Sequence, residues 1–346
     1  MACRKSAPFT EPSMPKVTQE TYRAHDELLD GLADRVADNL HILGDVDRNW
    51  QPTDFLPDLT AEDWRDQLDE FRQQALTVDD ETLVVLVGDM VTEEALPSYS
   101  IALNRIAKDH TGDSDAPWAR WLRGWTAEEN RHGDLLNAYL RLAGRVDMRS
   151  VERTVQHLLN SGFNPRTDAS PYDALVYTSF QERATKVSHR NVGRLAKKHG
   201  DNHLATICAR IAGDESRHEL FYTRMMDAVL DEDPDGGMLA IRRMIRGLIA
   251  MPGKHMCDGK TPDLFDRFSV VAQRSGVYTV RDYADILAHL VDTWDLANRP
   301  VTGKAARAQQ DMCAQPDRYR NLADAAEQRL AAEPSHPFPW IHDRLA

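Results

Sequence analysis

Cysteine and long apolar runs are scarce in this sequence, and each scarcity narrows the class of protein. The four cysteines among 346 residues are widely separated and form no CxxC pair. This spacing excludes a zinc ribbon or an iron–sulfur cluster made by this chain alone. No apolar stretch approaches the ~20 residues that cross a bilayer, so we expect no membrane span. The opening residues, MACRKSAPFTEPSMP, lack the apolar segment of a secretory signal.

Positive charge is also in short supply. Lys and Arg number 42 against 55 Asp and Glu, which gives a formal net charge of −13. A chain this acidic lacks the basic surface typical of nucleic-acid-binding proteins, so we expect no nucleic acid partner. The hydrophobic share of 42% and the charged share of 28% are those of a globular protein with a substantial core.

Signals for β-structure are missing as well, and the pattern is helical nearly throughout. The sequence lacks series of alternating apolar and polar residues joined by Asn-Gly or Asp-Gly turns. Capping residues and apolar periodicity instead predict four long helices, at about residues 79–108, 115–142, 170–200 and 201–232. Short connections join the first to the second and the third to the fourth, so each pair should form an antiparallel hairpin.

The stretch between the two hairpins, residues 145–169, is long enough for a crossover with its own short helix at 147–160. Further helices are expected at 18–43, 239–251, 280–294 and 305–332. The predicted fold is therefore all-α: a ferritin-like four-helix bundle, about residues 79–231, with additional peripheral helices. No composition shift marks a second domain, so we expect one domain over 1–346, with residues 1–17 poorly ordered.

Two Glu-x-x-His motifs carry the chemistry. They are Glu129/His132 in TAEENRHGDLL and Glu215/His218 in AGDESRHEL. Residues three apart lie on one helix face, so both side chains of a motif can reach the same ion. Each motif falls in register with an apolar stripe, where ionisable groups cost several kcal/mol unless they are neutralised or coordinated. The two motifs together therefore predict a metal site.

Chance alone would produce some of these motifs. With 17 Glu and 13 His in the chain, about 0.6 such pairs arise at random. A third pair, Glu333/His336, has a proline directly after its glutamate and is not expected to be helical. We interpret it as the chance instance.

The hairpin partners supply further carboxylates. Glu93 and Glu129 are nearly equidistant along the chain from the turn of the first hairpin, and Glu182 and Glu215 are so in the second. At about 1.5 Å per helical residue, the members of each pair lie level with one another. One Glu from each of two helices and Glu-x-x-His from each of the other two is the ligand set of carboxylate-bridged di-iron bundles. Hard oxygen donors with two imidazoles suit Fe or Mn better than a Cys-rich zinc site does, and two Fe ions are the predicted cofactor.

The acidic neighbours of these ligands are rival candidates. Glu94, Glu128 and Glu219 each point about 100° away from the apolar stripe, so we do not assign them as ligands. Asp214 and Asp134 are candidates for hydrogen bonds to the histidine ligands. Arg131 and Arg217 recur in both motifs and are interpreted as counter-charges. The alternative to a metal site is a set of four buried glutamates in ordinary ion pairs.

Residues 46–346 resemble the soluble acyl-acyl-carrier-protein desaturases, a family that includes plant stearoyl desaturase. The resemblance rests on VDRNWQPTDFLPD, GDMVTEEALPSY, YTSFQERATKVSH, DESRHE and FSVVAQRSGVYTVRDYADIL. All six predicted ligand positions match. The resemblance implies O2-dependent insertion of a cis double bond into an acyl chain carried on acyl carrier protein, with electrons from ferredoxin. It also implies a homodimer.

The resemblance assigns roles to residues outside the ligand set. Thr185, three residues after Glu182, corresponds to a threonine that assists oxygen activation and proton delivery. Trp50 corresponds to an electron-transfer tryptophan that works with Asp214 and His132. The side chains expected to line the acyl tunnel are Ala102, Ile106, Pro165, Thr167, Ala174 and Leu175. Arg105 and the pair Ala174–Leu175 depart from the family pattern, so chain length and double-bond position stay open.

Carrier protein is acidic, which requires a basic docking face, and Arg242, Arg243 and Arg246 are candidates. The alternatives are a di-iron hydroxylase or oxygenase acting on a carrier-bound substrate, and a ferritin-like iron oxidase or storage protein. The composition favours the cytoplasm, with the plastid stroma as the alternative compartment.

Overall fold

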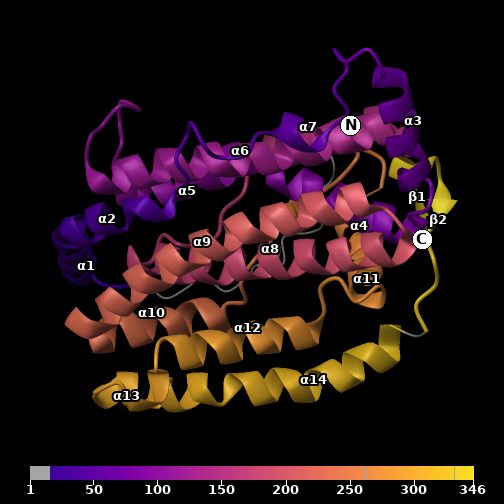
Figure 1. The fold of residues 1–346 in the computed structure, drawn as a ribbon. Coiled ribbons are helices and arrows are strands. Elements are labelled where there is room, and N and C mark those ends of the chain that lie inside the picture. Colours follow the sequence, from indigo (N-terminus) through magenta and orange to yellow (C-terminus); the bar gives the residue numbers. More distant parts are fainter. Residues whose placement is uncertain (1–15, 262, 331) are drawn as a thin grey trace.

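The computed structural model describes residues 16–261, 263–330 and 332–346. The expected disorder of residues 1–17 falls mostly outside the described residues. The structure is all-α apart from one small hairpin, as predicted. Figure 1 shows three long helices, α6, α8 and α9, running side by side along the molecule. Elements of the bundle and of the chain before it are α1 (Gln19–Gly31), α2 (Ala33–Asn39), η1 (Leu40–Ile42), η2 (Pro52–Phe55), α3 (Trp64–Ala75), α4 (Asp80–Glu93), α5 (Leu96–Ala107), α6 (Pro117–Ala143), α7 (Met148–Ser161), α8 (Tyr172–His199) and α9 (Asn202–Glu232).

The C-terminal third adds layers outside the bundle. In Figure 1, α10, α12, α13 and α14 lie below α8 and α9, and the hairpin lies beside the C-terminus. Strands β1 and β2 are antiparallel, with Pro337 opposite Leu345 and Phe338 opposite Arg344. These elements are α10 (Pro234–Arg246), η3 (Pro252–His255), α11 (Leu264–Arg274), α12 (Val280–Thr293), η4 (Leu296–Asn298), α13 (Gly303–Cys313), α14 (Gln315–Leu330), β1 (Pro337–Phe338), η5 (Pro339–Ile341) and β2 (Arg344–Leu345).

The bundle helices begin and end where their capping residues require. Asp79 and Asp201 accept hydrogen bonds from the backbone N–H groups of Thr82 and Leu204, which caps α4 and α9. Gly144 and Gly200 close α6 and α8 with φ values of 66° and 101°, a conformation that glycine adopts without a steric penalty.

The first long helix is interrupted, which corrects the expected continuous helix at 79–108. α4 ends at Glu93, and α5 starts at Leu96 after a turn at Glu94–Ala95. Pro97 has no N–H, so the carbonyl of Glu93 cannot receive the usual helical bond. The break leaves Glu93 as the last residue of α4.

Other boundaries also differ from expectation. The helix expected at 305–332 is two helices, α13 and α14, divided just before Pro316. α10 begins at Pro234, before the helix expected at 239–251, because Asp233 caps it by accepting from the N–H of Gly236. Helices α3 and α11 and the C-terminal hairpin were not predicted.

The core is made mainly by α4, α6, α8 and α9. α4 is buried almost all round, from Thr82 to Val91 apart from Asp89. The rings of Trp121 on α6 and Phe221 on α9 stack with centroids 3.3 Å apart, which joins the two hairpins. No helix in the described part of the chain is long and apolar enough to cross a bilayer.

Candidate metal centre

The structure brings all six predicted ligand side chains together inside the bundle. Glu93 comes from α4, Glu129 and His132 from α6, Glu182 from α8, and Glu215 and His218 from α9. Two groups of ligand atoms form, each with all atoms within 4.8 Å of one another. One group holds Glu93, Glu129, His132 and Glu215; the other holds Glu129, Glu182, Glu215 and His218. Glu129 and Glu215 are common to both groups.

The distances place each histidine nitrogen among carboxylates. His132 Nδ1 lies 3.6 Å from Glu129 Oε2 and 3.5 Å from Glu215 Oε1. His218 Nδ1 lies 2.8 Å from Glu129 Oε1 and 3.6 Å from Glu182 Oε2. These nitrogens carry the lone pairs that would face an ion if the outer Nε2 atoms carry protons.

Burial makes this arrangement costly without a cation. Both histidines are fully buried, and none of the four glutamates is more than 4% exposed. Within the described residues, the inward-facing atoms without a hydrogen bond include both carboxylate oxygens of Glu215 and also His132 Nδ1, which lies 3.5 Å from Glu215 Oε1. Such orphaned buried atoms cost about 1–3 kcal/mol each. The donor set therefore fits metal ions, because coordination would satisfy these atoms.

The pKa values of the cluster lead to the same conclusion. Burial raises the pKa of Glu93 to about 7 and raises that of Glu182 well above its usual range. Burial opposes a charged imidazole, yet contacts with carboxylates raise the pKa of His132 and of His218 well above the usual value. The cluster thus retains protons near neutral pH to offset its carboxylate charge. Two divalent cations would replace that positive charge.

The outer nitrogen of each histidine contacts a carboxylate from the opposite motif. His132 Nε2 on α6 lies 3.4 Å from Asp214 Oδ2 on α9, and His218 Nε2 on α9 lies 2.8 Å from Glu128 Oε2 on α6. Each carboxylate directly precedes a predicted ligand glutamate, so the pattern is crossed. Asp214 occupies the place that the sequence predicted. Asp134 does not, because its side chain is exposed.

Glu128 is the partner that sequence reasoning missed. It does point away from the inward-facing groups, but it is buried, since α9 covers it. Burial opposes its charge, but His218 and Arg217 prevail and lower the pKa of Glu128 to about 2. The recurring sequence acidic–Glu–x–Arg–His in both motifs was the available signal.

The outer carboxylates of the two groups are supported differently. Glu93 Oε1 is bonded to His189 Nε2 at 2.8 Å, and Glu182 Oε1 accepts a hydrogen bond from Trp125 Nε1 at 3.1 Å. His189 lies on α8 and is 1% exposed. It was not predicted; it lies in the quoted segment YTSFQERATKVSH, seven residues after Glu182 on the same helix face. Glu94, the rival of Glu93, instead accepts from Asn137 Nδ2 at the edge of the bundle.

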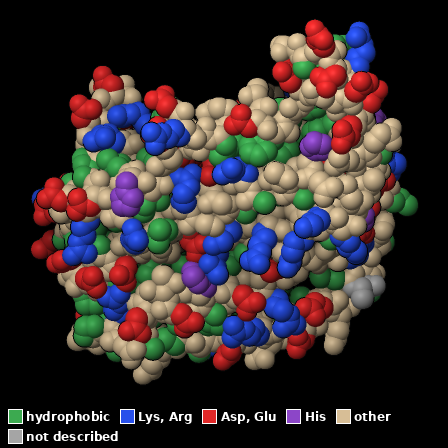
Figure 2. Space-filling model, in the orientation of Figure 1, with side chains coloured by type: hydrophobic (Ala, Val, Ile, Leu, Met, Phe, Trp, Pro, Cys, Tyr) green, Lys and Arg blue, Asp and Glu red, His purple; other side chains and the backbone are tan. Residues whose placement is uncertain are grey.

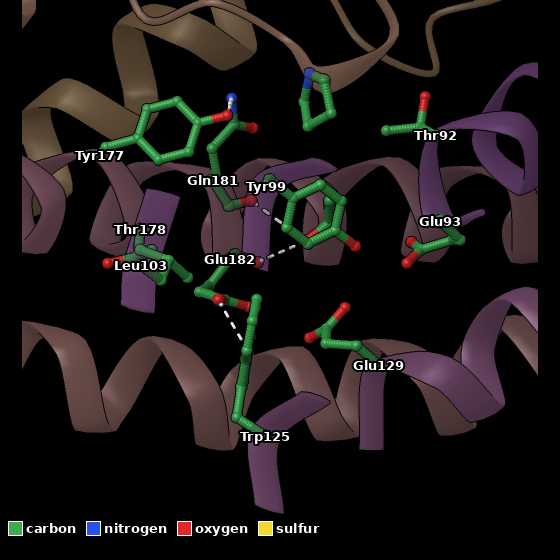
Figure 3. Close-up of a pocket in the computed structure, with 12 residues that line it drawn as sticks. Thr92, Glu93, Tyr99, Leu103, Trp125, Glu129, Tyr177, Thr178, Gln181 and Glu182 are labelled. Carbon is green, nitrogen blue, oxygen red and sulfur yellow. Dashed lines mark hydrogen bonds between the residues drawn. The ribbon is translucent and has the colours of Figure 1, made fainter. Parts of the chain in front are cut away.

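A cavity of about 40 Å³ borders the carboxylates. In Figure 3, Glu93, Glu129 and Glu182 face it from one side, while Tyr177 and Gln181 lie opposite. Apolar and aromatic side chains make most of the remaining wall, including Tyr99, Leu103 and Trp125. Such a cavity suits an apolar ligand held next to the carboxylates.

Thr185 lies on the wall of this cavity. Its hydroxyl donates back to the carbonyl oxygens of Gln181 and Glu182, each at 3.1 Å. Trp50 lies on the other side of the cluster, where its indole Nε1 donates to Asp214 Oδ2 at 2.9 Å. The rings of Trp50 and His132 are stacked, with centroids 6.1 Å apart. A continuous path thus runs from Trp50 through Asp214 to His132.

The six predicted tunnel residues do not line this cavity. Leu103 and Thr178 line it instead, next to Ala102 and one helical turn after Ala174. Five of the six are buried, and Ala102 is half-buried: Ile106, Pro165, Thr167, Ala174 and Leu175. Ala102 and Ile106 lie on α5 and Ala174 and Leu175 on α8, whereas Pro165 and Thr167 lie in the connection between α7 and α8.

One of the three candidate docking arginines is ruled out. Arg243 is buried and its guanidinium donates to the carboxylate of Asp173. Arg242 and Arg246 are about half-exposed, but both lie near Asp311, at 3.2 and 3.5 Å. A buried cation with a buried partner cannot contact a docking protein, so the prediction for Arg243 is wrong.

The bundle and its carboxylate–histidine cluster define a class of protein, the four-helix-bundle proteins with a metal centre held by glutamates and histidines. The fatty acid desaturase family matches this chain over residues 24–342. The chain belongs to that family.

Curated relatives cover nearly the whole chain. The chloroplastic stearoyl-[acyl-carrier-protein] 9-desaturase of Spinacia oleracea is 51% identical over 336 residues, which is 96% of this chain and 82% of that protein. The chloroplastic acyl-[acyl-carrier-protein] desaturase of Cucumis sativus is 48% identical and covers 99% of this chain and 89% of its own length. Among solved structures, a putative acyl-ACP desaturase of Mycobacterium tuberculosis has a TM-score of 0.51 at 21% identity, covering 84% of this chain and 99% of that one. That likeness confirms the ferritin-like fold.

Proposed function

We propose that this chain is an O2-dependent desaturase that inserts a cis double bond into an acyl chain carried on acyl carrier protein. The observation that carries the proposal is the position of the two overlapping ligand groups on the wall of a largely apolar cavity. The curated relatives named above support the substrate class, because their names give acyl or stearoyl chains on acyl carrier protein.

Two iron ions are the proposed cofactor. Glu93, Glu129, His132 and Glu215 would hold one ion, and Glu129, Glu182, Glu215 and His218 would hold the other. Four carboxylates balance the charge of two divalent ions, and oxygen with imidazole nitrogen suits iron. When bound, the iron pair supplies O2 reduction and removal of two hydrogen atoms from adjacent methylenes.

The chain's own residues position the substrate and control protons. Tyr99, Leu103 and Trp125 would hold the acyl chain against the carboxylates and exclude water from the cavity. Thr185 is the proposed proton donor at the cavity wall: a small rotation about its side-chain bond would release its hydroxyl from the helix carbonyls. Ala102, Ile106, Pro165, Thr167, Ala174 and Leu175 are proposed to line a deeper extension of the cavity that receives the distal end of the chain.

Ferredoxin is the proposed electron donor. A surface hollow beside Trp50 is lined by Phe55, Arg210, Asp214 and Arg217, among others. The guanidinium of Arg131 lies 4.5 Å from the centre of the Trp50 ring. A one-electron donor docked at this hollow would be close to the path from Trp50 to His132.

Acyl carrier protein needs a basic docking face on this acidic chain. Figure 2 shows Lys and Arg side chains gathered across the middle of one face, over the region of α8. Exposed cations on α8 include Arg190, Arg194, Lys197 and Lys198. We propose this row of α8, in place of the arginines of α10, as the docking face for an acidic carrier protein.

The chain is proposed to act as one domain and as a homodimer, which size-exclusion measurements would show near twice 39.2 kDa. A cage of many copies would instead indicate iron storage. The curated relatives are chloroplastic by name, so the plastid stroma stands beside the cytoplasm as the proposed compartment. Fractionation of source cells decides between the two.

The test is incubation of the iron-loaded protein with acyl carrier protein thioesters of several lengths, reduced ferredoxin and O2. Mass spectrometry of the released acyl chains should show the loss of two hydrogen atoms. A gain of one oxygen would identify a hydroxylase, and an unchanged acyl chain at every length would overturn the proposed activity.

A further inference from the structure

The segment 42–50, between η1 and η2, contacts the metal cluster from outside at two places. At one place Glu128 Oε1 accepts from the backbone N–H of Gly44 at 2.7 Å and from Asn49 Nδ2 at 2.9 Å. At the other, Asp214 Oδ2 accepts from Trp50 Nε1 at 2.9 Å. One short segment, called here the 42–50 loop, therefore holds both carboxylates that contact the histidines.

Two arginines also hold the 42–50 loop, by donating hydrogen bonds to backbone carbonyls at its two ends. Arg217 Nη1 donates to the carbonyl of Ile42 at 2.6 Å, and Arg131 Nη1 donates to the carbonyl of Trp50 at 2.5 Å. Arg217 Nη2 also donates to Glu128 and Asp214, at 2.9 and 2.7 Å. The two ends of the loop, the two carboxylates and the two arginines thus form one connected network.

This network ends at the proposed metal ligands. Glu128 lies 2.8 Å from His218 Nε2, and Asp214 lies 3.4 Å from His132 Nε2. A group bonded to the outer nitrogen of a ligand histidine fixes its tautomer and ring orientation. The loop therefore acts on each histidine through one carboxylate, and its Trp50 ring also stacks on the ring of His132.

Gly44 shows how closely the loop must approach. A Cβ atom at this position would lie 2.1 Å from Asn49 Nδ2 and 3.0 Å from Glu128 Oε1. Any side chain here must displace the Asn49 amide, the Glu128 carboxylate or the loop itself. Gly213, directly before Asp214, offers the contrast, because nothing lies within 4 Å of a Cβ built there.

We propose that the 42–50 loop is a positioning element for the metal centre, which orients His218 through Gly44, Asn49 and Glu128 and orients His132 through Trp50 and Asp214. This inference rests on the proposed metal ligands. Its consequence is that metal retention depends on a loop that supplies no ligand.

The test compares Gly44→Ala with Gly213→Ala as the matched control, both loaded with Co²⁺. The readouts are the visible absorption spectrum of bound Co²⁺, the rate of Co²⁺ release to a chelator, and the far-ultraviolet circular dichroism of the metal-free protein. Gly44→Ala should release metal about tenfold faster with an altered spectrum, since loss of support for a ligand typically costs 10–100-fold in metal affinity. Gly213→Ala should match the unsubstituted protein in all three readouts.

Asn49→Ala and Asn49→Asp provide a second pair that introduces no clash. Asn49→Ala removes one donor to Glu128, and Asn49→Asp places a second carboxylate against it, so release should be fastest in Asn49→Asp. Unchanged release and spectrum in Gly44→Ala and in both Asn49 variants would overturn the inference. Failure of the unsubstituted protein to bind Co²⁺ would instead overturn the proposed metal site, so the two failures are distinguishable.

Discussion

The two halves of the bundle carry the same Glu-x-x-His motif, but the side chains that contact the candidate ligands differ between them. In the half made by α4 and α6, Glu93 is bonded to the imidazole of His189. His132 contacts Asp214, which in turn accepts a hydrogen bond from Trp50. In the half made by α8 and α9, Glu182 accepts from the indole of Trp125. His218 contacts Glu128, which in turn accepts hydrogen bonds from Gly44 and Asn49. The inner carboxylates Glu129 and Glu215 serve both halves. The candidate ligands of the two halves are thus alike, but the residues bonded to them differ. The two metal positions should therefore differ in affinity and reactivity.

The largest effect on iron binding and turnover is expected for substitutions of the candidate ligands themselves, above all of those common to both groups. Glu215→Ala removes a carboxylate common to both groups, and His132→Ala removes a nitrogen from one of them. Both should abolish the near-ultraviolet absorbance of bound iron and turnover. Glu94→Ala is the matched control, because Glu94 adjoins a proposed ligand yet bonds only to Asn137. Iron content equal to that of the unsubstituted protein in Glu215→Ala would contradict the ligand assignment.

Thr185 stands three residues after Glu182, whereas the residue three after Glu93 is Leu96, so Thr185 tests whether that difference between the halves is functional. Thr185→Val keeps the shape of the side chain and removes the hydroxyl that faces the cavity. Turnover should fall roughly 10²-fold, the usual size of a proton-transfer contribution, with iron content unchanged. Thr185→Ser should restore most of the activity. If the hydroxyl serves only its own helix carbonyls, steady-state rates of the valine variant will match those of the unsubstituted protein.

The sequence was sufficient to bring together the six candidate ligands because helical period and distance from a turn are local quantities. Glu93, Glu129, Glu182 and Glu215 follow from counting along two hairpins. The surroundings depend on which helix faces meet, and that is a property of the packed bundle. His189 contacts Glu93 across 96 positions of the chain, and Glu128 is buried where α6 meets α9 and the loop that holds Gly44 and Asn49. Counting on α6 alone could not separate Glu128 from the exposed Asp134.

The helix boundaries teach a similar lesson. Pro97 and Pro316 were visible signals, yet apolar periodicity continued past both, so the breaks after Glu93 and Cys313 were missed. The break after Glu93 matters most, since it sets where the α4 carboxylate stands. The tunnel positions were taken from the family resemblance rather than from local pattern, and they lie beside the observed cavity rather than on its wall.

Glu93 and Glu182 are bonded to different partners, His189 and Trp125, which predicts a moderate difference in the free energy of unfolding when either partner is replaced. His189→Phe keeps a ring of similar size but leaves Glu93 Oε1 buried without its partner, which should cost about 1–3 kcal/mol. Trp125→Phe likewise leaves Glu182 Oε1 buried without its donor. Because the lost donor is a neutral indole, the cost should lie near the lower end of that range, about 1 kcal/mol, plus the lost packing of the larger ring. Urea unfolding of the metal-free variants measures both. Equal costs, or a larger one for Trp125→Phe after the packing loss is allowed for, would remove the distinction between the halves.

The smallest expected effect compares the carboxylates near the start of α4 and α8. Asp80 on α4 accepts from Arg344 on β2 at 2.7 Å, and this hydrogen bond lowers the pKa of Asp80 below its usual 3.8. Asp173 on α8 is buried, and burial outweighs its bonds to Arg243 and raises its pKa to about 6. A carboxyl group whose pKa is lower in the folded state than in the unfolded state stabilises the fold at pH values above its unfolded pKa, and this stability is lost as pH falls through the folded pKa. A carboxyl group whose pKa is higher in the folded state makes the fold less stable as pH rises.

Asp80→Asn should therefore destabilise the protein at pH 7 by at most about 1 kcal/mol, because the pair is partly exposed to solvent, and the difference should shrink as pH falls below 3.8. Asp173→Asn should change with pH in the opposite direction. As pH rises from 4 to 6, the unsubstituted protein should lose stability relative to that variant, since ionisation of Asp173 is disfavoured in the folded state. Urea unfolding at a series of pH values gives both slopes. If the two slopes have the same sign, the ion pair with Arg243 dominates the burial of Asp173, and the starts of the two helices are electrostatically alike.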